Sequence, residues 1–148
     1  KIKIKSFIVF ILVLGLMDIA IWMKKNNPYQ YVFFNAIGKK IGQQNFDLDY
    51  WGLSYYQNFN YLLKYDNSQN IKLWNSSKTK IFYSLFSLSE KDRERIIEVK
   101  NAEEADYLIT NYFFDETTYD KDFFLKHSII NSINVDGVAI NSIYKKIK

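Results

Sequence analysis

Residues 6–23 read SFIVFILVLGLMDIAIWM and are apolar almost throughout, with Asp18 as the single acid. An α-helix rises about 1.5 Å per residue, so about 20 such residues cross the hydrocarbon core of a bilayer. A helix that packs inside a soluble domain is rarely apolar on every side. The stretch therefore predicts a transmembrane helix with basic flanks over residues 1–25.

A signal sequence is the main competing interpretation of this run. Three lysines in the first five residues provide the basic start of a signal peptide. However, the run is longer than the apolar part of most signal peptides, and no small-x-small cleavage site follows it. Trp22, Lys24 and Lys25 resemble the aromatic and basic belt where a helix leaves a membrane. A transmembrane helix is preferred to an uncleaved signal-like anchor, and a soluble core helix is least favoured.

The charges around the run bear on its orientation. Three lysines precede it and two follow it, so the positive-inside rule favours a cytoplasmic N-terminus. We therefore expect the chain in the inner, cytoplasmic membrane, with its C-terminal part on the extracytoplasmic, periplasmic side. Asp18 lies about one and a half turns from the end of the run. Its carboxylate either reaches the interface or faces a helix outside this chain, and both interpretations stay open.

The net charge of +4 belongs to the N-terminal segment alone. Residues 1–25 contain five lysines and one aspartate, and the rest of the chain contains fifteen basic and fifteen acidic residues. The C-terminal part has no surplus charge to attract a phosphate backbone, so nucleic-acid binding is not expected. The chain has no cysteine, which excludes disulfides, thiolate metal sites and thiol catalysis.

Residues 26–44 predict an interfacial linker. Pro28 ends the helix, and the aromatic residues after it suit the membrane interface. Gly38 and Gly42 bracket a short loop in which Lys39 and Lys40 would lie beside lipid headgroups. The chain begins with lysine rather than methionine, from which we expect further sequence upstream.

Residues 45–148 predict a small extracytoplasmic α/β domain. The period-two alternation of residues 45–51 (NFDLDYW) indicates a half-buried strand, and Ser54 would cap a helix reaching about Lys64. Asp136-Gly137 between two alternating runs is a hairpin signal. The order of elements predicts a mixed sheet, parallel at first and antiparallel at its edge. The further expected elements are strands at 71–74, 96–99 and 107–111, helical segments at 81–88 and 89–95, and hairpin strands at 128–133 and 138–144.

Few residues carry recognisable chemistry. On a strand, Asp47 and Asp49 would lie on one face and could hold a divalent cation, but a solvated strand face is the preferred interpretation. His127, the single histidine, has no expected catalytic partner. Asn75-Ser76-Ser77 fits the N-glycosylation pattern, which is frequent by chance. We expect no catalytic residue, no cofactor and no metal in this chain. A solvated acidic loop is expected at Asp115, Glu116, Asp120 and Asp122.

Four separated blocks resemble a known family. They are PYQYVFFN (28–35), DLDYWGLS (47–54), ADYLITNY (105–112) and VDGVAINSIYK (135–145). Together they are similar to the C-terminal region of bacterial multi-pass glycosyltransferases of the GT-C type, related to protein mannosyltransferases and aminoarabinose transferases. Asn27 departs from the pattern, in which a histidine precedes the proline. By resemblance, the motif or interface residues are Pro28, Tyr29, Gln30, Tyr31, Asn35, Asp47, Asp49, Tyr50, Trp51 and Gly52.

The resemblance implies the C-terminal part of an integral-membrane glycosyltransferase with a lipid-linked sugar donor. In that family, transfer depends on acidic residues of an extracytoplasmic loop near the N-terminus, which this chain lacks, so the chain would be a non-catalytic accessory domain. Its partners would be membrane lipid, the upstream membrane helices and, through the parent protein, a polyprenyl-phosphate sugar. The alternative is a single-pass, membrane-anchored α/β binding module of the cell envelope. An enzyme based on the Asp-x-Asp pair is the least favoured hypothesis.

Overall fold

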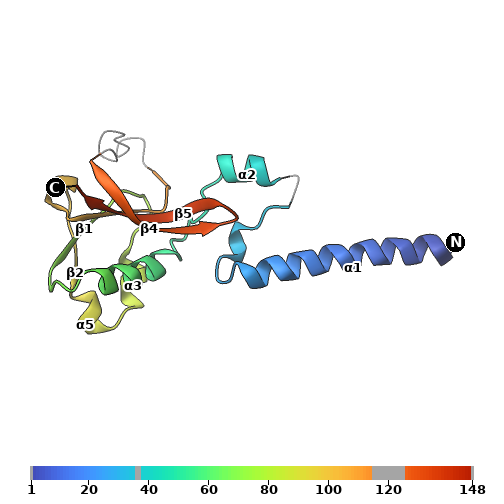
Figure 1. Ribbon diagram of the computed structural model, residues 1–148, viewed down its shortest axis with the longest axis horizontal. Helices are drawn as coiled ribbons and strands as arrows, with labels where there is room; N and C mark the ends of the chain where they lie inside the picture. Colours follow the sequence, from blue (N-terminus) through green and yellow to red (C-terminus); the bar gives the residue numbers. More distant parts are fainter. Residues whose placement is uncertain (1, 36–37, 115–125, 148) are drawn as a thin grey trace.

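The computed structural model describes residues 2–35, 38–114 and 126–147, and it consists of one long helix and an α/β domain (Figure 1). Helix α1 (Ile2–Lys25) extends away from the domain. It is long and apolar enough to cross a membrane, and none of its most apolar 18-residue window is buried. The helix ends before Pro28, as the sequence predicts, because proline has no amide proton and cannot continue a helix.

The domain contains a five-stranded mixed sheet with the order β2-β1-β3-β5-β4. The pairs β1–β2 and β1–β3 are parallel, whereas β3–β5 and β4–β5 are antiparallel. This confirms the predicted α/β class, the mixed sheet and the C-terminal hairpin. The strands are β1 (Ile71–Asn75), β2 (Ile96–Glu98), β3 (Tyr107–Thr110), β4 (His127–Val135) and β5 (Val138–Lys146).

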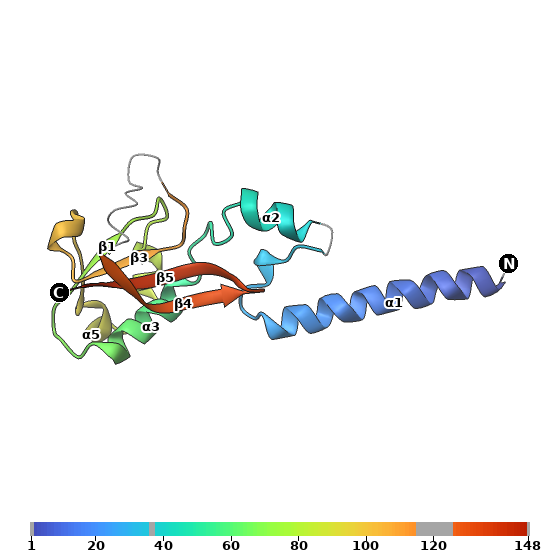
Figure 2. The same cartoon turned by 45° about the horizontal axis from the view of Figure 1, so that its top comes forward.

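Helix α3 (Tyr55–Tyr65) lies along one face of the sheet (Figure 2). Its apolar side chains recur at helical spacing, so Tyr55, Phe59 and Leu62 are fully buried against the strands. Ser54 is at the N-cap position, as expected, but its hydroxyl makes no capping hydrogen bond. The remaining short elements are η1 (Gln30–Val32), α2 (Lys39–Asn45), α4 (Phe82–Phe86), α5 (Glu90–Arg93) and η2 (Ala102–Glu104).

Two predicted elements are wrong. The basic loop at Lys39 and Lys40 is helical, because it begins α2. Residues 46–51 form turns instead of a strand. In this segment Asp49 is fully buried while Phe46 and Trp51 are exposed, the reverse of the expected pattern. The reason is that polar groups from distant segments satisfy Asp49, which a local hydropathy pattern does not report.

The apolar side chains form two buried clusters. The larger cluster joins α3 to the sheet. The smaller cluster lies at the tip of the β4–β5 hairpin, where Ile133, Val135 and Ile140 pack with Tyr29 and Val32. Residues of the predicted linker are thus part of the domain core. Because Trp22 also packs on this cluster, the end of α1 is fastened to the hairpin tip.

Candidate functional site

The end of α1 and the hairpin turn meet in a polar junction. The Trp22 indole Nε1 donates a hydrogen bond to Asp136 Oδ2 over 2.8 Å, and Lys39 Nζ lies 3.2 Å from the same oxygen. Asp136 has φ 53° and Gly137 has φ 84°, as a tight hairpin turn requires. The hydrogen bond from Trp22 lowers the pKa of the Asp136 carboxyl, and Lys39 lowers it further by a smaller amount. One carboxylate therefore joins α1, α2 and the hairpin.

A second polar network surrounds the buried Asp49 carboxylate. Tyr31 Oη donates to Asp49 Oδ1 over 2.5 Å, and Ser54 Oγ donates to Oδ2. Asn111 Nδ2 donates to the backbone oxygen of Asp49 over 2.7 Å. Asp49 is fully buried, so loss of hydration raises the pKa of its carboxyl, and the hydroxyl donors oppose that rise only in part. Three of the four resembling blocks, 28–35, 47–54 and 105–112, thus meet at one residue.

Asp47 and Asp49 do not act as a pair. Asp47 is exposed and Asp49 is fully buried, because the segment turns where a strand was expected. The prediction that both carboxylates lie on one face is therefore wrong. Within residues 2–35, 38–114 and 126–147, no group of three acidic, histidine or cysteine side chains could hold a metal ion. The expected absence of a cofactor stays a prediction.

The other motif residues divide into two groups. The network and the core include Tyr29, whose hydroxyl donates to Gln57, and Gly52, which has φ +67°. Peripheral positions hold Pro28, Gln30 and Asn35, of which Gln30 donates to Asn27 and Asn35 accepts from the Gly38 amide. Tyr50 and Trp51 are also exposed and form an edge-to-face pair 5.2 Å apart. The structure thus brings together Tyr29, Tyr31, Asp49 and Gly52.

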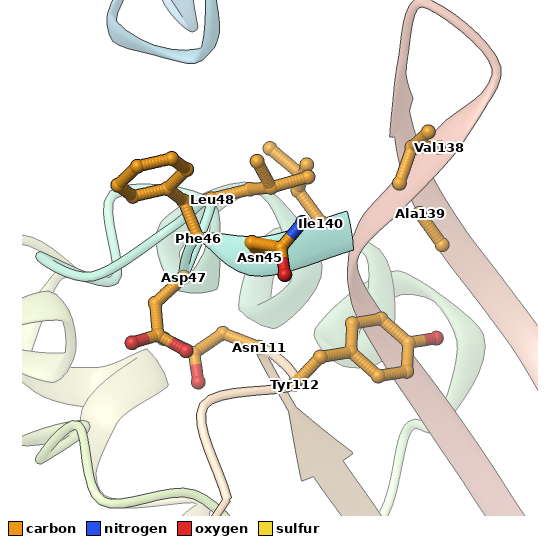
Figure 3. Close-up of a pocket in the computed structure, with 9 residues that line it drawn as sticks. All are labelled: Asn45, Phe46, Asp47, Leu48, Asn111, Tyr112, Val138, Ala139 and Ile140. Carbon is orange, nitrogen blue, oxygen red and sulfur yellow. The ribbon is translucent and has the colours of Figure 1, made fainter. Parts of the chain in front are cut away.

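A pocket of about 400 Å³ lies beside the Asp49 network (Figure 3). The turn after α2, the segment after β3 and the start of β5 form its walls, so three of the resembling blocks meet there. Asp47, Asn111 and Tyr112 contribute polar groups, and β5 contributes aliphatic side chains. The full lining is Asn45, Phe46, Asp47, Leu48, Asn111, Tyr112, Val138, Ala139 and Ile140.

Several expectations concern residues away from this region. His127 begins β4, as a strand-entry histidine would, and is 8% exposed. Asn75 of the glycosylation pattern donates to the backbone oxygens of Ser77 and Thr79, so a folded domain does not present its amide for modification. The expected acidic loop, with Asp115, Glu116, Asp120 and Asp122, lies outside the described residues.

Sequence reasoning missed the residues that complete the two networks. The sequence pattern does not predict that Asn111 and Ser54 contact Asp49. Asn111 is 62 residues from Asp49 in the sequence, and Ser54 is 5 residues from it. The sequence predicts an interfacial belt residue at Trp22 and a turn residue at Asp136, and neither prediction indicates that the two side chains meet. The signal available for Ser54, Asn111 and Asp136 was that each lies within one of the resembling blocks, whereas Trp22 lies outside them. No protein-family model, curated protein or solved structure matches this chain.

Proposed function

We propose that this chain is a membrane-anchored accessory domain, the C-terminal part of an integral-membrane glycosyltransferase that uses a lipid-linked sugar donor. The observation that carries the proposal is the hydrogen bond from Trp22 to Asp136, which joins the last turn of the apolar helix to the hairpin tip. A domain fastened in this way is held directly against the surface from which the helix emerges. It can shape the acceptor side of a membrane enzyme without performing chemistry itself.

The surface near the end of α1 supports the anchored arrangement. Ile41 is 64% exposed and Phe46 is 66% exposed, and Lys24 and Lys25 end the helix. Exposed apolar and basic side chains of this kind suit the boundary between headgroups and acyl chains. We propose that this boundary belongs to the inner membrane and that the domain lies on its extracytoplasmic side.

The Asp49 network supports an architectural role. The carboxylate is fully buried and already accepts hydrogen bonds from Tyr31 and Ser54, so a substrate cannot reach it. The blocks that resemble glycosyltransferases therefore converge on a structural centre. Such a convergence suits a supporting domain of a larger enzyme, since it positions residues 28–35 against residues 47–54 and 105–112.

An exposed aromatic surface favours a second candidate, the envelope-binding module. Phe82, Tyr83 and Phe86 of α4 are 54%, 77% and 57% exposed, and Trp51 is 76% exposed. Ser84 Oγ donates to the backbone oxygen of Gly52, so α4 adjoins the turn that carries Trp51. Contiguous exposed apolar surface marks interaction sites. In a transferase this surface would face the missing membrane part, and in a single-pass protein it would face an envelope partner.

Alkaline extraction of membranes tests the anchor. The wild-type chain should stay in the pellet, and Leu14→Arg should move a substantial fraction to the supernatant. An arginine at the centre of a membrane helix costs about 2.5–3.5 kcal/mol on insertion scales. Leu53→Arg is the matched control, because Leu53 is 54% exposed on the domain and its replacement should leave the chain in the pellet. Release of the wild-type chain with α1 intact would contradict the proposal.

Two further observations separate the candidates. An open reading frame that continues upstream through further apolar spans supports the transferase, whereas a start codon just before Lys1 supports the single-pass module. Protease added to intact spheroplasts should digest the domain. A protected domain would place it in the cytoplasm and contradict the proposed orientation.

A further inference from the structure

The pocket beside the hairpin tip has the composition of a ligand site. Its volume of about 400 Å³ falls within the size range of small-molecule sites, and it combines aliphatic walls with a few polar groups. We propose that it binds a protonated amine on a small headgroup or molecule, with Asp47 as the counter-ion. This site would exist whether or not the chain is part of a glycosyltransferase.

Asp47 gives the pocket its charge. It is the single charged residue among those that line the pocket, and its carboxylate makes no hydrogen bond or ion pair with the described residues. A second, smaller pocket offers a contrast, because there Asp106 lies with Lys145 and Lys146. The acid of the first pocket is therefore uncompensated, and an anionic ligand such as a phosphate would be repelled.

The remaining polar side chains of the pocket have acceptors to spare but few donors. Asn45 Nδ2 already donates to the backbone of Ile41 over 2.8 Å. Asn111 Nδ2 already donates to Asp49 and Thr79 over 2.7 and 2.9 Å. The Asn111 amide oxygen accepts one hydrogen bond, from the Phe113 amide over 3.3 Å, so it keeps a second lone pair, and the Asn45 amide oxygen and the Asp47 carboxylate also keep unused lone pairs. An ammonium group has three donors and no acceptor, so it complements this set.

Tyr112 supplies an aromatic wall whose position is enforced. Its φ of 62° is a left-handed conformation that bulky residues rarely adopt. Hydrogen bonds hold it there: its amide donates to Thr110 Oγ1 over 3.0 Å, and its hydroxyl lies 2.6 Å from Ser142 Oγ. Strain of this kind is concentrated at binding sites. Figure 3 shows the Tyr112 ring and the Asp47 carboxylate on different sides of the pocket.

Aromatic rings favour an organic cation over a metal ion. The faces of Tyr and Phe rings attract ammonium groups, and Phe46 forms part of the same lining. A calcium ion needs six to eight oxygen ligands, whereas the side chains that line this pocket offer one carboxylate, two amide oxygens and one phenol oxygen. Because the hairpin tip contacts Trp22 at the end of α1, the amine has two accessible sources, a lipid headgroup or a free solute.

Methyl NMR of the full chain in uncharged detergent micelles tests the site. With alanine methyl groups labelled, Ala139 reports on the pocket and the buried Ala105 reports on the fold elsewhere. Ethanolamine should shift the Ala139 signal saturably and leave Ala105 unchanged. Ethylene glycol, which replaces the amine by a hydroxyl, should bind at least about tenfold more weakly, because hydrogen bonds to charged groups are the stronger ones.

Two aspartate variants make the experiment specific. Asp47→Asn should weaken ethanolamine binding about tenfold or more, while Asp106→Asn in the second pocket should leave it unchanged. An unshifted Ala105 signal in the Asp47→Asn variant, and an unshifted Ala139 signal in the ligand-free Asp106→Asn variant, show that the two variants fold. Equal binding by the Asp47→Asn variant, or equal binding of ethylene glycol, would overturn the proposal. Neither result would affect the alkaline extraction test.

Lipid nanodiscs identify the source of the amine. Phosphatidylglycerol discs with and without phosphatidylethanolamine are compared, with no free ethanolamine added. An Ala139 shift that appears only with phosphatidylethanolamine assigns a lipid headgroup. If neither type of disc shifts the Ala139 signal, free ethanolamine is then added, and a shift that appears at that step assigns a free amine. An Ala139 signal that responds to neither source overturns the proposal.

Discussion

The Asp49 carboxylate is held by hydroxyl groups from two other parts of the chain, Tyr31 and Ser54. A buried charge is costly unless its oxygens accept hydrogen bonds, and here each oxygen accepts one from a side chain. Burial still raises the pKa of this carboxyl above its ordinary value of 3.8. Desolvation by the same surroundings raises the pKa of the Tyr31 hydroxyl. Asp49 thus joins three segments of the domain through contacts that the residues next to it in the sequence do not predict.

Asp49→Asn should lower the free energy of unfolding by about 1–3 kcal/mol, because the amide offers one acceptor oxygen to two hydroxyl donors. Burial raises the folded-state pKa of Asp49 above the ordinary value of 3.8, so its contribution to stability is complete below pH 3.8 and is lost as the pH rises through the higher folded-state pKa. The stability difference between wild type and variant should therefore shrink between acidic and neutral pH. Thermal unfolding followed by near-ultraviolet circular dichroism measures it.

Asp47→Asn is the control for this prediction. Asp47 lies two residues away and is exposed, so its replacement should change stability by at most about 0.5 kcal/mol. If the two variants proved equally stable, Asp49 would have no structural role.

The turn that ends at Gly52 decides how the 46–54 segment folds. Gly52 has φ +67°, and a Cβ atom there would lie 2.6 Å from Tyr55 Cδ2 and 2.8 Å from Thr79 Cγ2. Tyr55 is fully buried and cannot move aside. Only glycine therefore allows the chain to reverse before α3 and to bring Asp49 beneath it. If residues 45–51 formed the predicted strand, residue 52 would not need a positive φ angle, and glycine would not be required there.

Gly52→Ala should destabilise the domain by about 2–4 kcal/mol, from the left-handed conformation and the clash together. Gly137 is the matched comparison, since it also has positive φ, at 84°, but a Cβ there would meet nothing within 4 Å. Gly137→Ala should cost only about 1–2 kcal/mol. Denaturant unfolding of both variants measures the difference. Equal costs would mean that the space around Gly52 is not restrictive.

The hairpin was the element most easily predicted, whereas the 45–51 strand was wrong. A hairpin depends on local chemistry, because Asp136 and Gly137 adopt the positive φ angles that the turn needs and the flanking residues alternate. The alternation of 45–51 is equally regular. It fails because tertiary partners bury Asp49 and leave Phe46 and Trp51 exposed. Periodicity reports burial only when the buried residues are apolar.

For the whole molecule, the decisive contact is the one between α1 and the hairpin tip. Trp22 donates to Asp136, and its ring packs edge-to-face against Phe33 at 4.9 Å. Without this contact, residues 26–28 would be the only link between the last turn of the helix and the domain core, which begins at Tyr29. With it, the helix and the domain share the small hydrophobic cluster around Val135. The orientation of the pocket and of α4 relative to the membrane then follows from the orientation of α1.

Trp22→Phe keeps an aromatic ring but removes the hydrogen bond to Asp136. Local opening of the hairpin tip should become about 1–2 kcal/mol easier, because hydrogen bonds to charged groups are worth about 1.5–3 kcal/mol and this site is half-buried. Native-state hydrogen exchange of the tip amides measures the change. Lys39→Met should have the smaller effect, since its side chain is 41% exposed and exposed ion pairs contribute little.

The same junction should respond to acid. The pKa of Asp136 is lowered from 3.8, chiefly by the Trp22 hydrogen bond, so its contribution is present above pH 3.8 and is lost as the pH falls through the folded-state value. The difference in exchange between wild type and Trp22→Phe should therefore disappear in strong acid. An undiminished difference would show that the hydrogen bond is not the cause.

By itself, the sequence determined the apolar helix, the α/β class, helix α3, the short strands β1, β2 and β3, the short helices α4 and α5, and the hairpin. These depend on local periodicity, turn chemistry and proline, which act within a few residues of each other. Tertiary structure alone decided that Asp49 is buried and Asp47 exposed, that Trp22 binds Asp136, and that Asn111 and Tyr112 meet the 45–48 turn in a pocket. Those features join groups up to 114 residues apart, so they form only when the packed chain brings donors and acceptors together.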